Sequence, residues 1–186
     1  MNLSDGLVFL VDVVFSLYIY VIILRVLLEF MRADYYNPLC QLVLKLTDRP
    51  VLFLQKLLPR LSVIDLPALI LLIIVELIKL ALLCLITAQV FPVFTFLKVI
   101  IADLVGQLIM LYCFMIILFA ILSWVQNPRT AAMIFVLSTL INPVLKPIRR
   151  IIPLISGVDL SPLIALIILY FIYIVLVAPT MARALI

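Results

Sequence analysis

Histidine is absent from this sequence of 186 residues, and glycine and cysteine occur only three times each. The lack of histidine removes the commonest general base and the commonest metal ligand. So few glycines leave no glycine-rich phosphate loop and no Gly-x-x-x-Gly packing face. Cys40, Cys84 and Cys113 are odd in number and widely separated, so they indicate neither a disulfide framework nor a metal site. We therefore expect no enzymatic activity, no metal, no cofactor and no nucleic-acid ligand.

Charged residues are also scarce, at 12% of the chain, whereas 69% of the residues are hydrophobic. A soluble domain is about half apolar, with about a quarter of its residues charged. So much apolar surface requires lipid as its solvent. No Lys or Arg precedes Arg25, so the chain lacks the basic start of a signal peptide and its first apolar run is interpreted as a retained span.

The apolar runs predict an all-α membrane protein with four transmembrane helices. A span needs about 20 apolar residues. Four runs qualify, at residues 7–30, 66–90, 103–124 and 160–177. Pro92 and Lys98 interrupt the stretch 90–102, which we interpret as a short hairpin lying partly in the interface. A five-span count is the alternative.

One short segment of the sequence occurs twice, at residues 57–67 and 151–162. Each copy follows a basic stretch that contains proline, and each leads into a long apolar run. A repeat of this kind in a membrane protein indicates duplication of one helix-loop-helix unit. We therefore divide the chain into two tandem repeats, residues 1–95 and 96–186.

The two long connections, residues 31–65 and 125–159, carry most of the basic residues. The stretch 90–102 carries only Lys98, and the C-terminal tail carries only Arg183. Loops rich in Lys and Arg remain in the cytoplasm. The pattern predicts two cytoplasmic loops and both termini outside, in a multi-pass protein of the bacterial inner membrane.

Both basic connections have the periodicity of amphipathic interfacial helices, with apolar residues in lipid and basic residues toward anionic head groups. Proline inside a helix removes a hydrogen bond, so we expect two short helices in each connection, joined near Pro50 or Pro143. They could also be plain anchors or re-entrant segments. The predicted face for lipid or partner binding consists of Lys45, Arg49, Lys56, Arg60, Lys146, Arg149 and Arg150.

Asp65 and Asp159 stand where each basic connection meets the next span. An aspartate there can cap a helix, because its carboxylate accepts hydrogen bonds from free backbone amides. Pro67 and Pro162 fit the first turn that follows. We expect both aspartates to be helix caps.

Five charged residues fall within the first two spans, and they form a candidate intramembrane polar centre. Arg25 and Glu29, and likewise Glu76 and Lys79, have helical spacing that allows each pair to meet. The centre could conduct ions or protons, or its pairs could simply hold two spans in register. We expect the second half to lack matching charges, since its spans offer only Gln107, Tyr112 and Ser123. The five charged residues are Asp12, Arg25, Glu29, Glu76 and Lys79.

Several of these segments resemble the YggT family of bacterial inner-membrane proteins, which is related to the YlmG proteins of other bacteria and plastids. The segments are Leu24-Arg25, Tyr36-Asn37-Pro38, residues 56–65, Leu122-Ser123-Trp124, and residues 142–153 and 157–162. The resemblance implies a small polytopic membrane protein with no established enzymatic activity. It also implies an association with osmotic or salt tolerance, with envelope organisation or, in plastids, with assembly of cytochrome complexes. It supplies no active site.

Two functions are compatible with this reading. The first is an organising, assembly or stress-tolerance factor whose basic interfacial helices bind anionic lipid head groups or partner membrane proteins. The alternative is an oligomeric protein related to ion or osmolyte transport that uses Glu76 and Lys79. The unmatched charges of the first half and the strong basic faces favour the first.

Overall fold

The computed structural model describes residues 3–33, 36–56, 65–89, 92–125, 128–151 and 159–180, and every regular element in these ranges is helical. Most of the repeated segment lies outside them, as does Arg60 of the predicted basic face. The elements are α1 (Leu3–Phe30), α2 (Pro38–Gln55), α3 (Leu66–Thr87), α4 (Val93–Trp124), α5 (Pro128–Ile151), α6 (Ser161–Ile172) and the π-helix η1 (Tyr173–Val177).

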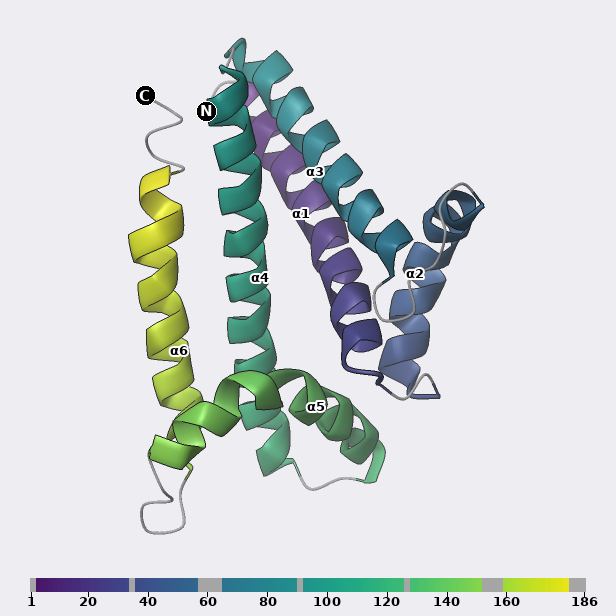
Figure 1. The fold of residues 1–186 in the computed structure, drawn as a ribbon, viewed down its shortest axis with the longest axis vertical. Helices are drawn as coiled ribbons and strands as arrows, with labels where there is room; N and C mark the ends of the chain where they lie inside the picture. The colour runs from purple at the N-terminus through teal and green to yellow at the C-terminus, as the bar shows by residue number, and fades with distance from the viewer. Residues whose placement is uncertain are drawn as a thin grey trace.

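Four helices, α1, α3, α4 and α6, form the long axis of the molecule, and α2 and α5 lie at one end of them (Figure 1). Helix α1 packs most extensively against α3, while α4 packs against α5, α6 and η1. Figure 1 shows α5 crossing the ends of α4 and α6 rather than running beside them. The helices that carry the basic residues therefore gather at the same end of the bundle.

Five helices in the described ranges are long and apolar enough to cross a membrane: α1, α3, α4, residues 130–151 of α5, and residues 161–180. The spans expected at 7–30, 66–90 and 160–177 correspond to α1, α3 and the α6–η1 segment. The additional candidate is α5, which the sequence assigned to a connection. Most large exposed side chains are apolar, as expected where lipid replaces water.

The prediction of a short hairpin at residues 90–102 is wrong. Helix α4 begins at Val93 and continues without interruption to Trp124, so residues 93–102 are its first turns. Pro92 is the residue just before the helix. A proline disrupts a helix when it is inside, but it is tolerated at the N-terminal boundary, where an amide without a partner is expected anyway.

The expectation of two short helices in each basic connection is also wrong. Helix α2 continues through Pro50, and α5 continues through Pro143 and Pro147. Both ribbons are bent (Figure 1). A proline removes one hydrogen bond and usually kinks a helix. Val51, just after Pro50, and Leu145, between Pro143 and Pro147, are both fully buried and hold the two helices against the bundle.

The main hydrophobic core lies toward the end of the bundle that α2 and α5 cover. It joins residues of all six α-helices, with Ile19 and Ile22 of α1, Ile116 of α4 and Leu140 of α5 completely buried. A smaller cluster of Leu80, Val99 and Ile100 joins α3 and α4 further along the bundle. The amphipathic helices are therefore part of the folded core rather than loose connections.

Gly106 allows the close approach of α4 to η1, and this contact gives a direct test of the packing. A Cβ atom at residue 106 would lie 2.9 Å from Val177 Cγ1 and 3.3 Å from Tyr173 Cε2. Because Val177 is β-branched and stiff, Gly106→Ala should destabilise the protein by about 1–3 kcal/mol. Thermal unfolding in detergent would measure this loss. Gly6→Ala is the matched control, since its Cβ would meet nothing within 4 Å; equal melting of both variants would contradict the contact.

Candidate functional site

A buried arginine joins the first three helices. The Arg25 guanidinium on α1 donates from Nε to Asp65 Oδ2 at 3.1 Å, and from Nη1 to Thr47 Oγ1 at 2.8 Å and Asp48 Oδ1 at 2.7 Å. Thr47 in turn donates its hydroxyl hydrogen to Val43 O. The side chains of Arg25 and Asp65 are 6% and 2% exposed, so this pair is shielded from water. Arg25 therefore fixes α2 between the end of α1 and the start of α3.

Asp65 has a second bond within this network. It is the N-cap residue of α3, and its Oδ1 accepts the Ala68 amide at 3.3 Å. One carboxylate thus caps α3 and pairs with Arg25. The sequence predicted the cap, whereas the ion pair depends on how α1 crosses α3.

The second half has a related arrangement, in which the arginine belongs to the amphipathic helix itself. Arg149 of α5 contacts Asp159 Oδ2 through Nε and Nη2, both at 2.9 Å, and donates from Nη1 to Asn142 Oδ1 at 3.4 Å. Asn142 and Asp159 stand at the same spacing as Asp48 and Asp65 in the first copy. In both halves an arginine links the amphipathic helix to an aspartate shortly before the next helix.

Asp159 is not the N-cap itself, which corrects the prediction. Leu160 occupies that position, and Asp159 Oδ1 accepts the Ser161 amide at 2.9 Å from one residue earlier. The second copy has one more residue than the first between aspartate and proline, which displaces the helix start. Burial alone would raise the pKa of Asp159, but its bonds with Ser161 and Arg149 outweigh this and hold the pKa below the ordinary value.

Helix α2 turns its basic residues away from the protein. Its buried side consists of Cys40, Val43, Thr47 and Val51. At about 100° per residue, Lys45, Arg49 and Lys56 lie on the opposite side, and all three are exposed. Leu42, Leu46 and Phe53 are more than half exposed and flank this basic stripe. A helix lying at a membrane surface has such an apolar flank beside a basic face.

Helix α5 has the same combination of a buried apolar side and exposed basic residues. Leu140, Ile141 and Leu145 are completely buried, while Lys146, Arg149 and Arg150 are exposed. The start of α2 is tied to α5, because Asn37 Nδ2 donates to Ala132 O at 2.7 Å. Within the described part of the chain, no ion pair neutralises five of these exposed cations: Lys45, Arg49, Lys56, Lys146 and Arg150.

A second polar cluster lies between α3 and α4. Lys79 Nζ is 3.1 Å from Glu76 Oε2 and also pairs with Asp103 Oδ2. Gln107 Nε2 donates to Glu76 Oε2 at 3.4 Å and to Asp103 Oδ2 at 3.2 Å. Glu76 and Lys79 are 0% and 1% exposed in their side chains, against 26% for Asp103. Two carboxylates therefore share one ammonium group and one amide in a nearly closed space.

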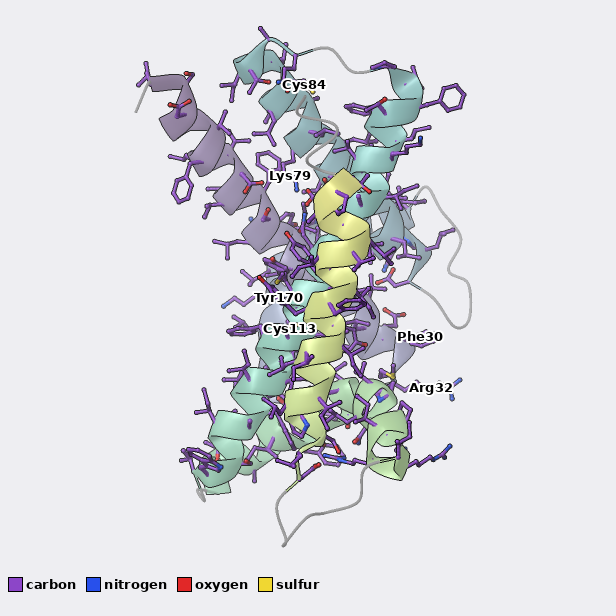
Figure 2. All side chains as sticks on the ribbon, turned by 90° about the vertical axis from the view of Figure 1, so that its left-hand side faces the viewer. Phe30, Arg32, Lys79, Cys84, Cys113 and Tyr170 are labelled. Carbon is purple, nitrogen blue, oxygen red and sulfur yellow. The ribbon has the colours of Figure 1, made fainter. Side chains whose placement is uncertain are left out.

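The two networks lie at different depths. Glu76 is 11 residues beyond Asp65, which corresponds to about 16 Å along α3 at 1.5 Å per residue. Half of a hydrocarbon core is about 15 Å. Figure 2 shows Lys79 toward the Cys84 end, far from Arg32 and from α5. If Asp65 marks one interface, Glu76 lies near the middle of the bilayer.

Comparison with known proteins identifies the family. The CCB3/YggT family model matches residues 4–86 and 98–180, which is most of the chain. The chain belongs to the CCB3/YggT family. Among its relatives, "Uncharacterized protein YggT" of Escherichia coli K12 is 36% identical over 174 residues, covering 90% of this chain and 87% of the relative.

Two further similar proteins come from other bacteria. "Uncharacterized protein in proC 3'region" of Vibrio alginolyticus is 36% identical over 169 residues, covering 90% of this chain and 91% of the relative. An uncharacterised protein of Haemophilus influenzae is 33% identical over 171 residues, covering 92% and 91%. No solved structure matches the chain. The names of these relatives state no activity.

The predicted polar centre is divided by the structure of this YggT-family protein. Glu76 and Lys79 meet as expected, but Arg25 belongs to the separate network with Asp48 and Asp65. Glu29 is half-buried near the end of α1, and Asp12 is exposed on the same helix. Among the described residues, Asp12 has no hydrogen bond or ion pair to either network.

Asp103 is the residue that the sequence reading missed. The sequence places Asp103 at the first residue of the span expected at 103–124. In the structure it lies inside α4, which begins ten residues earlier at Val93, and it pairs with Lys79. The helical spacing from Asp103 to Gln107 was the available signal. The polar residues expected in the spans of the second half are therefore incomplete, because Asp103 also supplies a charged partner to the Glu76–Lys79 pair.

The two arginine networks should differ in their contribution to stability. Removing one partner of a buried pair leaves an uncompensated charge, so Arg25→Met should lower the free energy of unfolding by about 3–5 kcal/mol. Arg149→Met is the matched variant in the second half. Its pair is 38% and 31% exposed, so about 0–1 kcal/mol is expected. Unfolding in detergent with denaturant would compare them, and similar losses would contradict the difference in shielding.

Proposed function

We propose that this protein is a non-enzymatic organising factor of the bacterial inner membrane that gathers anionic lipids at its basic helices. The observation that carries the proposal is the set of exposed, unneutralised cations on α2 and α5, at one end of the bundle (Figure 1). Each basic residue near an anionic surface contributes about 1 kcal/mol. Arg25 and Arg149 support this role by holding the two helices in fixed positions.

The proposal includes four spans in two tandem repeats, with α2 and α5 at the cytoplasmic face. Three observations support it: the family model matches two successive segments, α2 and α5 occupy the same end of the bundle, and α5 lies across α4 and α6. The excess of Lys and Arg in the two long connections favours a cytoplasmic location for that end. Both chain ends are then on the opposite side of the membrane.

The span count can be tested through the two termini. Four spans leave both ends outside the cytoplasm, whereas five spans leave them on opposite sides. Alkaline phosphatase fused after Ile186 should therefore be active in cells, and a green fluorescent protein fused there should be dark. A fusion after residue 125 provides the cytoplasmic reference and should give the reverse result. A fluorescent C-terminal fusion would reject the four-span arrangement.

Lipid binding can be tested with purified protein in a nonionic detergent. Binding of fluorescent phosphatidylglycerol, followed by polarisation, should be tighter than binding of phosphatidylcholine and should weaken with salt. Lys45→Ala, Arg49→Ala, Lys146→Ala and Arg150→Ala should each weaken phosphatidylglycerol binding about fivefold, since about 1 kcal/mol is lost.

Lys98→Ala provides the matched control for lipid binding. Lys98 is also an exposed lysine, but it lies near the start of α4, away from α2 and α5. Its removal should leave phosphatidylglycerol binding unchanged. Equal weakening by Lys98→Ala, or no preference for the anionic lipid, would overturn the proposal.

A further inference from the structure

The cluster of Glu76, Lys79, Asp103 and Gln107 has more acid than base. With every group ionised, two carboxylates face one ammonium group, so the cluster carries a net charge of −1. An uncompensated charge at the centre of a membrane costs at least about 2.5 kcal/mol on the most lenient scales. Neutralising the cluster therefore requires one additional positive charge.

The hydrogen bonds of the cluster also indicate that one proton is missing. Glu76 Oε1 and Gln107 Oε1 are buried acceptors with no hydrogen-bond partner, and the two residues are 0% and 5% exposed. Gln107 already uses its amide nitrogen for both carboxylates. Buried polar atoms are nearly always satisfied. The cluster thus has acceptors to spare and too few donor hydrogens, and a carboxylic acid supplies such a hydrogen.

No neighbouring group in the described chain provides the missing positive charge. On α3 the charged neighbour is Lys79, and on α4 it is Asp103. From α1, Tyr20 interacts electrostatically with Asp103 and Lys79, and with Asp12 on its own helix; from η1, Tyr173 interacts with Tyr20. Tyrosines and carboxylates only add negative charge when they ionise. Lys79 is therefore the one cation facing the cluster within the described residues.

One carboxylate of the cluster is partly exposed at the protein surface. The Asp103 side chain is 26% exposed, whereas Glu76 and Lys79 are closed off. Lys79 and Gln107 each contact both carboxylates, so they connect the accessible acid to the buried one. Next to Gln107, Gly106 packs on the π-helix η1. π-Helical turns occur frequently at functional sites.

We propose that Glu76, Lys79, Asp103 and Gln107 form a proton-binding site in the membrane interior, loaded through Asp103. One proton adds to one of the two carboxylates, giving a carboxylic acid, and no other bond is made or broken. The pair then shares a single negative charge that Lys79 balances. This site is separate from the lipid-binding helices and does not depend on the function proposed for them.

Infrared spectroscopy of the protein reconstituted in vesicles tests this proposal directly. At neutral pH the wild-type protein should show the carbonyl stretch of a protonated carboxylic acid, shifted to lower frequency in heavy water. Glu76→Gln and Asp103→Asn should each abolish the band, because one carboxylate and Lys79 are then neutral without a proton. Asp12→Asn is the control: it removes an exposed acid of the same bundle and should keep the band.

The wild-type measurement decides the question even if the variants do not fold. Absence of an exchangeable carboxylic-acid band from the folded wild-type protein would overturn the proposal. A band that persists in folded Glu76→Gln and Asp103→Asn would also overturn it, because the proton would lie elsewhere. A band that is seen only in choline chloride and is missing in sodium or potassium chloride would show that a metal cation, and not a proton, occupies the site in those salts, and would reject the proposal for them.

Discussion

The buried pair of Arg25 and Asp65 is the interaction on which the first half of the molecule depends. An arginine remains charged in any protein environment, so it must find acceptors once α1 is covered by α2 and α3. Asp65, Thr47 and Asp48 provide them. Because these acceptors come from two other helices, satisfying one guanidinium also fixes the position of an amphipathic helix against the bundle.

The two halves use different residues to link the amphipathic helix to the start of the next helix. In the second half the arginine comes from the amphipathic helix itself, as Arg149, and its partners Asn142 and Asp159 are more exposed. Phe119 stands at the position equivalent to Arg25. An apolar residue at that point needs no hydrogen-bond acceptor, and the arginine–aspartate pair of this half lies nearer the protein surface. An amphipathic helix is therefore linked to the next helix by a buried charge network in the first half and by a more exposed ion pair in the second.

The second polar cluster is shared between the halves rather than belonging to one of them. Glu76 and Lys79 come from α3, while Asp103 and Gln107 come from α4. Their contacts cross the junction between the two repeats expected from the sequence. An incomplete hydrogen-bond network costs more free energy in lipid than in water, because the bilayer core holds no water that could supply the missing hydrogen bonds. The acid-rich cluster with unused acceptors is consequently the place where we propose that a proton binds.

The sequence by itself determined the membrane character, the C-terminal end of α1, the start of α3 and the basic and apolar stripes of α2, because hydrophobic length and helical periodicity are local properties. It also indicated the Glu76–Lys79 pair, whose members are neighbours on one helix. Only the tertiary structure decided that Arg25 pairs with Asp65 and that Asp103 joins Lys79. Contacts between helices depend on crossing angles and depth, which arise from packing of the whole bundle and have no signature at a fixed spacing along the chain.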